Sequence, residues 1–221
     1  MAFVSDRAAL YAELRAGMAE LGLATQAAAI ESLLDYLELL ARWNAAYNLT
    51  AVRAPKQMVT HHLLDSLAVA PLLRGERIAD IGSGAGLPGI PLAILRPESR
   101  ITLVDANGKK TRFLREAVRT LGLGNARIET QRVENLRGEF DTVTARAFAG
   151  LGDMLRLAGH LLAADGIVLA LKGQIRREEI VGLPEGFVVA DVQPLRVPGL
   201  AAARHAVIIQ RSQAAVRGHA A

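Results

Sequence analysis

Cysteine is absent from the 221 residues, which excludes disulfide bonds and thiolate chemistry. The chain also lacks any apolar run near the roughly 20 residues that a membrane-spanning helix needs. Charged side chains at Asp6, Arg7, Glu13 and Arg15 interrupt the N-terminal region, so this region has no signal-peptide pattern. Together these absences predict a soluble cytoplasmic protein that does not associate with membranes.

The overall composition is that of a folded protein with a small excess of positive charge. Hydrophobic residues make up 51% and charged residues 22%, a balance typical of globular domains rather than disordered chains. The formal net charge is +4 and the pI is about 9.8, which suits a polyanionic partner. Because almost all the basic residues are arginine, the excess can equally reflect genome composition, and charge alone leaves the partner open.

The first third of the chain is predicted to be helical. Two helices are expected in the first forty-odd residues and a third over residues 56–73, because apolar residues recur there at helical spacing. The stripes of the first two consist of Leu10, Leu14, Met18 and Leu21, and of Ile30, Leu33, Leu34, Leu37 and Leu40. Residues 1–74 are therefore expected to form an N-terminal helical cap.

From Arg77 onward, short β-branched runs alternate with helical segments, a rhythm typical of right-handed βαβ units on a parallel sheet. The predicted strands are 78–81, 101–104, 127–129, 141–145 and 167–171, and the predicted helices are 87–95, 109–121 and 151–162. No helix separates the last two strands, 187–192 and 205–210, so they are expected to be antiparallel. The sequence thus predicts an α/β core over residues 75–212, followed by a frayed tail at 213–221.

A glycine-rich segment, Asp80 to Gly89, follows the first predicted strand and opens a helix. It contains both a dinucleotide fingerprint starting at Gly84 and the pattern Gly82-x-Gly84-x-Gly86, which is typical of S-adenosylmethionine-dependent methyltransferases. Because the strand is predicted to end at Ile81, the dinucleotide fingerprint starts too late. The Asp80 carboxylate would also repel a pyrophosphate and attract the ammonium of a methionine moiety. The segment therefore favours a methyltransferase.

Asp105 follows the second predicted strand, 19 residues after Gly86, where a carboxylate can accept hydrogen bonds from both ribose hydroxyls of a nucleotide cofactor. Dehydrogenases and methyltransferases share this arrangement, so Asp105 predicts that an adenosine ribose is bound but does not distinguish the two classes of enzyme. The alternative role is to cap the helix that starts near Lys109.

Several segments in the same order along the chain resemble one family, the bacterial ribosomal small-subunit guanine-N7 methyltransferases, also called the glucose-inhibited division protein B family. The matching segments are residues 43–50 (WNAAYNLT), 62–66 (HLLDS), 80–91, 103–105 (LVD), 109–114 (KKTRFL), 146–148 (RAF) and 171–173 (LKG). The resemblance implies a Rossmann-like class I methyltransferase fold. Its mostly parallel sheet would have seven strands, an antiparallel C-terminal strand and an N-terminal helical cap. It also implies methyl transfer from S-adenosylmethionine to N7 of a guanine in 16S ribosomal RNA. The RNA would be bound within the small ribosomal subunit or an assembly intermediate.

The resemblance also implies which residues bind the cofactor. When the residues of the glycine segment and Asp105 are combined with those that the resemblance implies, the expected cofactor-binding residues are Asp80, Gly82, Gly84, Gly86, Leu87, Asp105, Val133, Glu134 and Arg146. The chain departs from the family at Asn135, where a second acidic residue is common. The expected substrate-binding residues are Asn48, Arg146 and Lys172. Lys109, Lys110, Arg112 and Arg115 can form a solvated helix face or follow RNA phosphates.

Neither a catalytic base nor a metal ion is expected. Guanine N7 carries an exposed lone pair and loses no proton on methylation, and none of the five histidines stands in a context that indicates proton transfer. The alternative functions are methylation of another RNA or a small molecule, NAD binding on a Rossmann fold, and RNA binding without catalysis.

Overall fold

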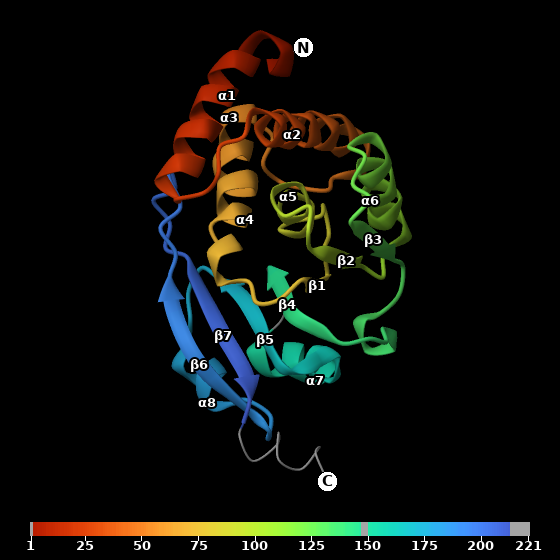
Figure 1. Ribbon diagram of the computed structural model, residues 1–221, viewed down its shortest axis with the longest axis vertical. Helices are drawn as coiled ribbons and strands as arrows, with labels where there is room; N and C mark the ends of the chain where they lie inside the picture. Colours follow the sequence, from red (N-terminus) through yellow and green to blue (C-terminus); the bar gives the residue numbers. More distant parts are fainter. Residues whose placement is uncertain (1, 147–149, 213–221) are drawn as a thin grey trace.

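The computed structural model describes residues 2–146 and 150–212, with the side chains described from Asp6 onward. A seven-stranded sheet with the order β3-β2-β1-β4-β5-β7-β6 forms its centre (Figure 1). The strands are β1 (Arg77–Ile81), β2 (Arg100–Val104), β3 (Ala126–Glu129), β4 (Phe140–Arg146), β5 (Leu162–Lys172), β6 (Phe187–Pro194) and β7 (His205–Arg211). The pairs among β1 to β5 are parallel, whereas β7 is antiparallel to both β5 and β6. This confirms the predicted fold class and the antiparallel pairing of the last two strands. The predicted frayed tail lies outside the described residues.

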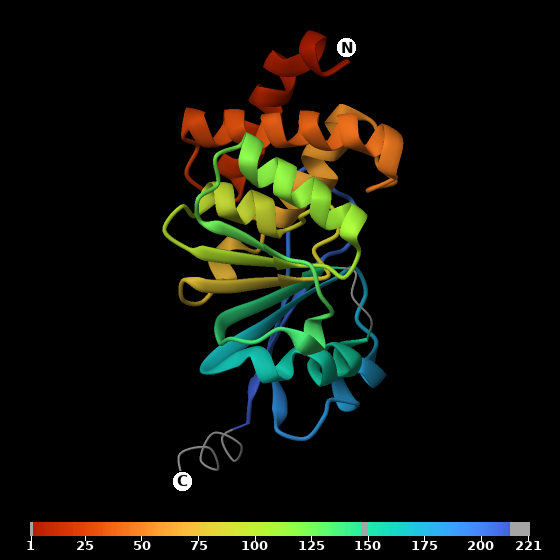
Figure 2. The ribbon, with the colours of Figure 1, turned by 90° about the vertical axis from the view of Figure 1, so that its right-hand side faces the viewer.

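Helices cover both faces of the sheet. Successive strand residues point to opposite sides, so each face contributes apolar side chains to its own core. On one face, Ile78, Ile101 and Leu103 belong to a core shared with α5 (Gly89–Leu95) and α6 (Gly108–Thr120). On the other face, Ala79, Ile81 and Val104 belong to a second core shared with α7 (Leu151–Ala158). Figure 2 shows α5 and α6 above the sheet and α7 below it. The short helix α8 (Arg177–Val181) packs beside α7.

The N-terminal helices extend the first of these cores. The helices α1 (Ala2–Glu20) and α2 (Ala27–Tyr47) pack on each other, and α2 also packs on α5 and α6. Leu14, Met18, Leu33 and Leu37 are fully buried in the same cluster as Ile78 of the sheet. The apolar stripes predicted from helical spacing therefore face a core that is continuous with one face of the sheet. Figure 2 shows α2 lying above α5 and α6.

The prediction of one regular helix over residues 56–73 is wrong. The segment consists of α3 (Pro55–Met58), the π-helix η1 (Val59–Leu64), α4 (Asp65–Leu67) and the 3₁₀-helix η2 (Ala70–Leu72). Most of its residues from Met58 to Ala70 are buried. Because this segment is enclosed on nearly all sides, tertiary packing determines its local geometry, and the helical spacing of its apolar residues does not specify which type of helix forms.

Two predicted helix boundaries also differ. Helix α5 begins at Gly89 rather than at residue 87, because the preceding residues form a loop held by Ser83, whose carbonyl accepts from the N–H of Gly86 at 2.7 Å. Helix α7 ends at Ala158 and a 3₁₀-turn, η4 (Gly159–Leu161), leads directly into β5. A further 3₁₀-turn, η3 (Val133–Asn135), lies between β3 and β4. Within the described ranges, no helix is long and apolar enough to cross a bilayer.

Candidate functional site

The glycine loop after β1 adopts a backbone that glycine favours. The φ angles of Gly82, Gly84 and Gly86 are 64°, 58° and 88°, in the left-handed region. At Gly86, an added Cβ would lie 2.6 Å from Ile90 Cγ1 and 2.9 Å from Leu114 Cδ2. At Gly84, the nearest heavy atom to an added Cβ would be the Gly82 oxygen, 3.8 Å away. Gly86 is thus required by packing and conformation, whereas Gly84 is required by conformation and borders open space.

The Ser83 side chain fixes this loop to the sheet. Its hydroxyl donates to the carbonyl of Asp80 at 2.7 Å and accepts from the N–H of Val104 at 2.9 Å. Ser83 is 3% exposed. Because these bonds join the ends of β1 and β2, the loop begins directly after Ile81, as the sequence predicted.

Asp105, the residue after β2, holds the loop from the other side. Its Oδ2 accepts from the N–H of Gly84 at 2.9 Å and its Oδ1 accepts from the N–H of Asn107 at 2.8 Å. The alternative role considered for Asp105, capping the next helix, belongs to Asn107, whose side chain accepts from the N–H groups of Lys109 and Lys110. Each carboxylate oxygen of Asp105 keeps acceptor capacity for a further donor.

A pocket of about 280 Å³ opens beside Asp105, beyond the carboxyl ends of β1 and β2. It is lined by Gly82, Val104, Asp105, Ala106, Gln131, Arg132, Val133, Glu134 and Leu157. Four of the residues predicted to bind the cofactor, from three separate segments, thus meet around one cavity. Val133 supplies an apolar wall and Asp105 an acceptor, and the crevice outside the carboxyl ends of the strands is where open α/β sheets bind ligands.

Two other residues predicted to bind the cofactor are buried beneath the loop. Asp80 is 0% exposed, and its Oδ2 accepts from the N–H of Gly89 at 3.1 Å. Its Oδ1 has no hydrogen-bond partner among the described residues. Burial raises the pKa of the Asp80 carboxyl to about 7, partly offset by the Gly89 bond. Leu87 is 4% exposed and packs in the core shared with α5.

A second cluster of polar side chains lies at the ends of β4 and β5. Arg146 donates to the carbonyl of His61 at 3.0 Å and pairs with Asp65 Oδ2 at 3.2 Å. Arg204, from the connection between β6 and β7, pairs with Asp65 Oδ1 at 2.9 Å. The Asp65 side chain is 3% exposed and each arginine side chain is 24% exposed. One buried carboxylate therefore orients two arginines.

These residues line a second pocket, of about 420 Å³. Its lining comprises Val52, His61, His62, Asp65, Arg146, Leu171, Lys172, Gly173 and Arg204. Lys172 Nζ pairs with Glu179 Oε1 at 2.8 Å. Burial, and then the charge of Arg146, lowers the pKa of His62 to about 4, so this imidazole is neutral at neutral pH. The pocket thus presents three basic side chains, the Asp65 carboxylate between two of them, and an uncharged ring.

Of the predicted substrate-binding residues, Arg146 and Lys172 meet in this second pocket, whereas Asn48 is not among the residues that line it. Asn48 is an exposed residue with φ 50° at the C-terminus of α2, and its Oδ1 accepts from Arg53 at 3.0 Å. Arg204 and His62 also line this pocket, and neither was predicted from the sequence as a site residue. The antiparallel finish could have indicated Arg204, because the start of β7 pairs with the end of β5, His205 opposite Lys172.

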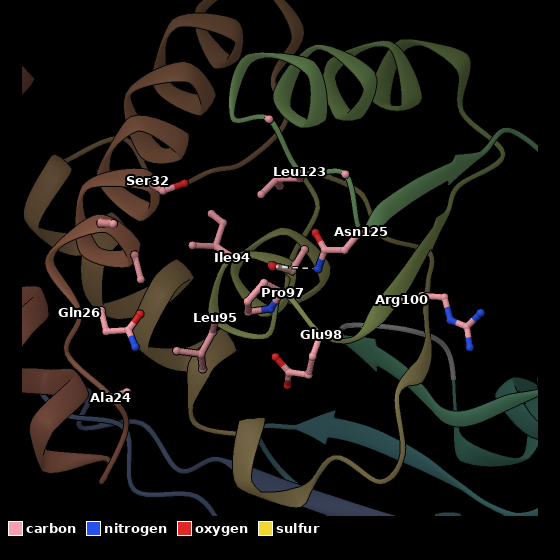
Figure 3. A pocket seen from close by; sticks show the side chains of 15 residues that line it. Ala24, Gln26, Ser32, Ile94, Leu95, Pro97, Glu98, Arg100, Leu123 and Asn125 are labelled. Atoms are coloured by element: carbon pink, nitrogen blue, oxygen red, sulfur yellow. Dashed lines mark hydrogen bonds between the residues drawn. The ribbon is translucent and has the colours of Figure 1, made fainter.

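A larger cavity, of about 870 Å³, lies near the amino ends of β2 and β3, at the other end of these strands from the glycine loop (Figure 3). It is bordered by the start of α2 at Gln26, by Ile94 and Leu95 of α5, and by Asn125 before β3. Asn125 donates its amide hydrogens to the carbonyls of Ala93, Arg96 and Ser99 and thereby holds this corner together. Residues predicted to bind a ligand do not line it, so its size alone does not make it the site.

Comparison with known proteins gives concordant matches. Residues 29–208 match the GidB family model, described as rRNA small subunit methyltransferase G. A protein named ribosomal RNA small subunit methyltransferase G from Stenotrophomonas maltophilia (strain K279a) is 53% identical over 204 residues, covering 91% of this chain and 95% of that protein. A protein of the same name from Laribacter hongkongensis (strain HLHK9) is 53% identical over 197 residues, covering 88% and 95%.

Among solved structures, the fold is similar to TrmN from Thermus thermophilus, with a TM-score of 0.54 and 22% identity over 77% of this chain and 52% of that chain. It is also similar to magnesium protoporphyrin IX methyltransferase from Synechocystis PCC 6803 with bound SAM, with a TM-score of 0.53 and 19% identity over 80% and 91%. At these identities the two structures support the fold alone.

Proposed function

Since this chain belongs to the GidB family of rRNA small subunit methyltransferase G proteins, we propose that it transfers a methyl group from S-adenosylmethionine to N7 of a guanine in 16S ribosomal RNA. The observation that carries the proposal is the convergence of the glycine loop, Asp105 and the Val133–Glu134 turn around one pocket at the carboxyl ends of β1 and β2. In that pocket we place the cofactor.

The chemistry of the pocket fits the adenosine half of this cofactor. The Asp105 carboxylate has acceptor capacity for the ribose hydroxyls, and its bond to the N–H of Gly84 keeps it aimed along the loop. The Val133 side chain offers an apolar surface to a planar base, with Glu134 beside it. The open space next to Gly84 lets a ligand approach the backbone closely.

For the methionine half, we assign supporting roles to Asp80, Gly86 and Leu87. Asp80 has one oxygen without a hydrogen-bond partner in the part of the chain that the structure describes, and a carboxylate there favours a nearby ammonium group. Gly86 and Leu87 shape the loop against α5. Arg146 lies at the end of β4 and pairs with Asp65 in the second pocket, so we assign it to the border between cofactor and substrate.

When bound, the cofactor supplies an electrophilic methyl group on a sulfonium. The protein then has to bring the guanine N7 lone pair into line with that group, and such alignment can contribute about 7–11 kcal/mol to catalysis. Because N7 loses no proton, the pocket of Arg146, Lys172 and Arg204 needs only to bind and orient the nucleotide. Guanidinium and ammonium groups suit the O6 and phosphate oxygens of a guanine nucleotide.

We further infer that the target guanine is unstacked when it is methylated. N7 lies on the major-groove edge, which is deep and narrow in A-form RNA and closed to side chains. The substrate is therefore an RNA loop, presented within the small ribosomal subunit or an assembly intermediate. The exposed Asn48 and Arg53, hydrogen-bonded to each other, stand close in sequence to Val52 of the second pocket and are assigned to the same RNA.

Methyl transfer from radiolabelled S-adenosylmethionine tests this function. The purified protein is incubated with small ribosomal subunits, with protein-free 16S ribosomal RNA, or with transfer RNA. We expect label only in 16S RNA, recovered as 7-methylguanine after digestion. Label in transfer RNA alone, or in a product other than 7-methylguanine, would contradict the proposal.

A further inference from the structure

A shallow groove between α2 and α6 lies outside both pockets described above. We call it the α2–α6 groove and define it by its lining residues, Leu39, Arg42, Trp43, Ala46, Tyr47, Glu116, Arg119 and Thr120. Its volume is about 510 Å³. The two helices lie side by side above the sheet (Figure 2).

The floor of the groove is an aromatic pair. The rings of Trp43 and Tyr47 stack with their centroids 5.2 Å apart and their planes inclined by 27°. Trp43 also packs against the buried ring of Phe113, at 5.7 Å, which fixes the pair to the core. Tyr47 is 38% exposed although tyrosine rings usually gain from burial. A rigid ring therefore faces solvent.

Cations flank this ring. Arg42 is exposed, and the Arg119 side chain is 74% exposed. The single carboxylate of the groove, Glu116, is hydrogen-bonded to Arg119 at 2.7 Å, and this bond holds the pKa of Glu116 below its usual range. Since one carboxylate faces two guanidinium groups, the groove carries a net positive charge.

The exposed face of α6 connects the groove to the cofactor pocket. Lys109, Arg112 and Arg119 are exposed and spaced so that they share one face of the helix. Helix α6 starts at Gly108, just after Asp105, which lines the cofactor pocket. From Lys109 to Arg119 the helix rises about 15 Å, so a chain of phosphates can follow it from the pocket to the groove.

We propose that the α2–α6 groove is a docking site for an unpaired nucleotide of the RNA substrate, whose base stacks on Tyr47 while its backbone follows the cations of α6. The proposal rests on the proposed function for the identity of the partner. Stacking of a base on an exposed aromatic ring beside arginines is the usual way in which proteins hold single-stranded RNA. Double-stranded RNA has no free base face to offer.

The chain contains one tryptophan, and it is Trp43, so its fluorescence reports on this groove directly. The protein is titrated with a short single-stranded RNA and, separately, with a duplex of the same composition. We expect saturable quenching by the single strand and little by the duplex. Quenching by both to the same extent, or by neither, would overturn the assignment. So would a fluorescence change that follows protein concentration without RNA, because that indicates self-association.

Substitutions separate stacking from folding. Tyr47→Ala should weaken binding of the single strand about tenfold, the loss expected for one stacked base. Tyr47→Phe keeps the ring and should bind like the unaltered protein. Equal affinity of the two variants, with unchanged circular dichroism, would show that the ring does not contact RNA.

A second pair of variants tests the cations. Arg119→Glu should raise the KM for 16S ribosomal RNA about tenfold and leave kcat and cofactor affinity unchanged. The matched control is Arg156→Glu on α7, because Arg156 pairs with Asp153 at 2.5 Å in the same i,i+3 arrangement but on the other face of the sheet. Equal KM values for the two variants would overturn the groove while leaving methyl transfer intact. If the unaltered protein transfers no methyl group to the RNA, the proposed function fails, and the quenching experiment still decides on the groove.

Discussion

Ribose binding and capping of α6 were both considered for Asp105 from the sequence, and the structure gives the capping role to Asn107, two residues later. Asp105 lines the pocket in which we place the cofactor, whereas Asn107 caps α6. Asp105→Asn keeps the shape but removes the charge, and should raise the Kd for S-adenosylmethionine at least about tenfold, because a charged acceptor is lost. Asn107→Ala should lower the free energy of unfolding by about 1 kcal/mol with little change in that Kd. Calorimetric titration and urea unfolding measure the two effects. A Kd that is unaltered in Asp105→Asn would contradict the ribose assignment.

Asp80 and His62 are buried ionisable groups that should give folding stability opposing dependences on pH. The folded-state pKa of Asp80, about 7, lies above its ordinary value of 3.8, so the folded protein binds the additional proton and loses stability as pH rises from about 4 to 7. The folded-state pKa of His62, about 4, lies below 6.5, so its contribution grows as pH rises from about 4 to 6.5.

Asp80→Asn removes the first of these contributions. Its stability relative to the unaltered protein should therefore increase steadily from pH 5 to pH 7.5. Urea unfolding at several pH values measures the difference. A difference that is constant with pH would show that Asp80 is ionised in the folded protein over the whole range.

Among the elements, α2 contacts both the glycine loop and the α2–α6 groove. The buried Tyr36 hydroxyl donates to the carbonyl of Ala85 at 2.7 Å, and its ring lies 6.4 Å from that of Phe113. Tyr36→Phe should cost about 1–3 kcal/mol of stability because the carbonyl of Ala85 loses its partner, and should weaken cofactor binding several-fold as the loop loosens. Tyr47→Phe, the same change at an exposed position on the same helix, is the control and should alter neither quantity. Identical cofactor affinity in both variants would contradict a role of α2 in holding the loop.

Some helices and strands could be predicted from the sequence and others could not. The strands β1, β2 and β4 were predicted to within a few residues because each is a short β-branched run, buried on both faces, that alternates with helical segments. The helix α6 was predicted because its apolar residues recur on one buried face. The π-helix η1 was not predicted, because helical spacing of apolar residues indicates a helix without specifying its type, and tertiary packing determines the type in this buried segment.

The same distinction applies to the site. The glycine loop could be predicted because positive φ angles impose glycine locally. The Asp65–Arg204 pair could not, since its partners lie 139 residues apart and only the completed sheet brings them together.

At the scale of the whole molecule, the charge of +4 is small, so RNA affinity depends on where the cations lie. Lys109 is exposed, and Lys110 Nζ lies 3.8 Å from Asp105 Oδ2. Replacing both by alanine should reduce the slope of log K against log salt by about 1–2, because fewer counterions are released. Filter binding of 16S ribosomal RNA over a range of salt concentrations measures this slope. If the slope is unchanged, the RNA phosphates lie elsewhere.

The atom that receives the methyl group tests the central claim most directly. Small-subunit RNA is assembled with 7-deazaguanine at the target position, so that carbon replaces the nucleophilic nitrogen while the rest of the base is kept. Single-turnover transfer from labelled S-adenosylmethionine is then compared with that to normal RNA. The proposed chemistry predicts that the analogue binds with similar affinity and accepts no methyl group. Methyl transfer to the analogue at the normal rate would place the reaction on another atom and contradict the function proposed for this chain.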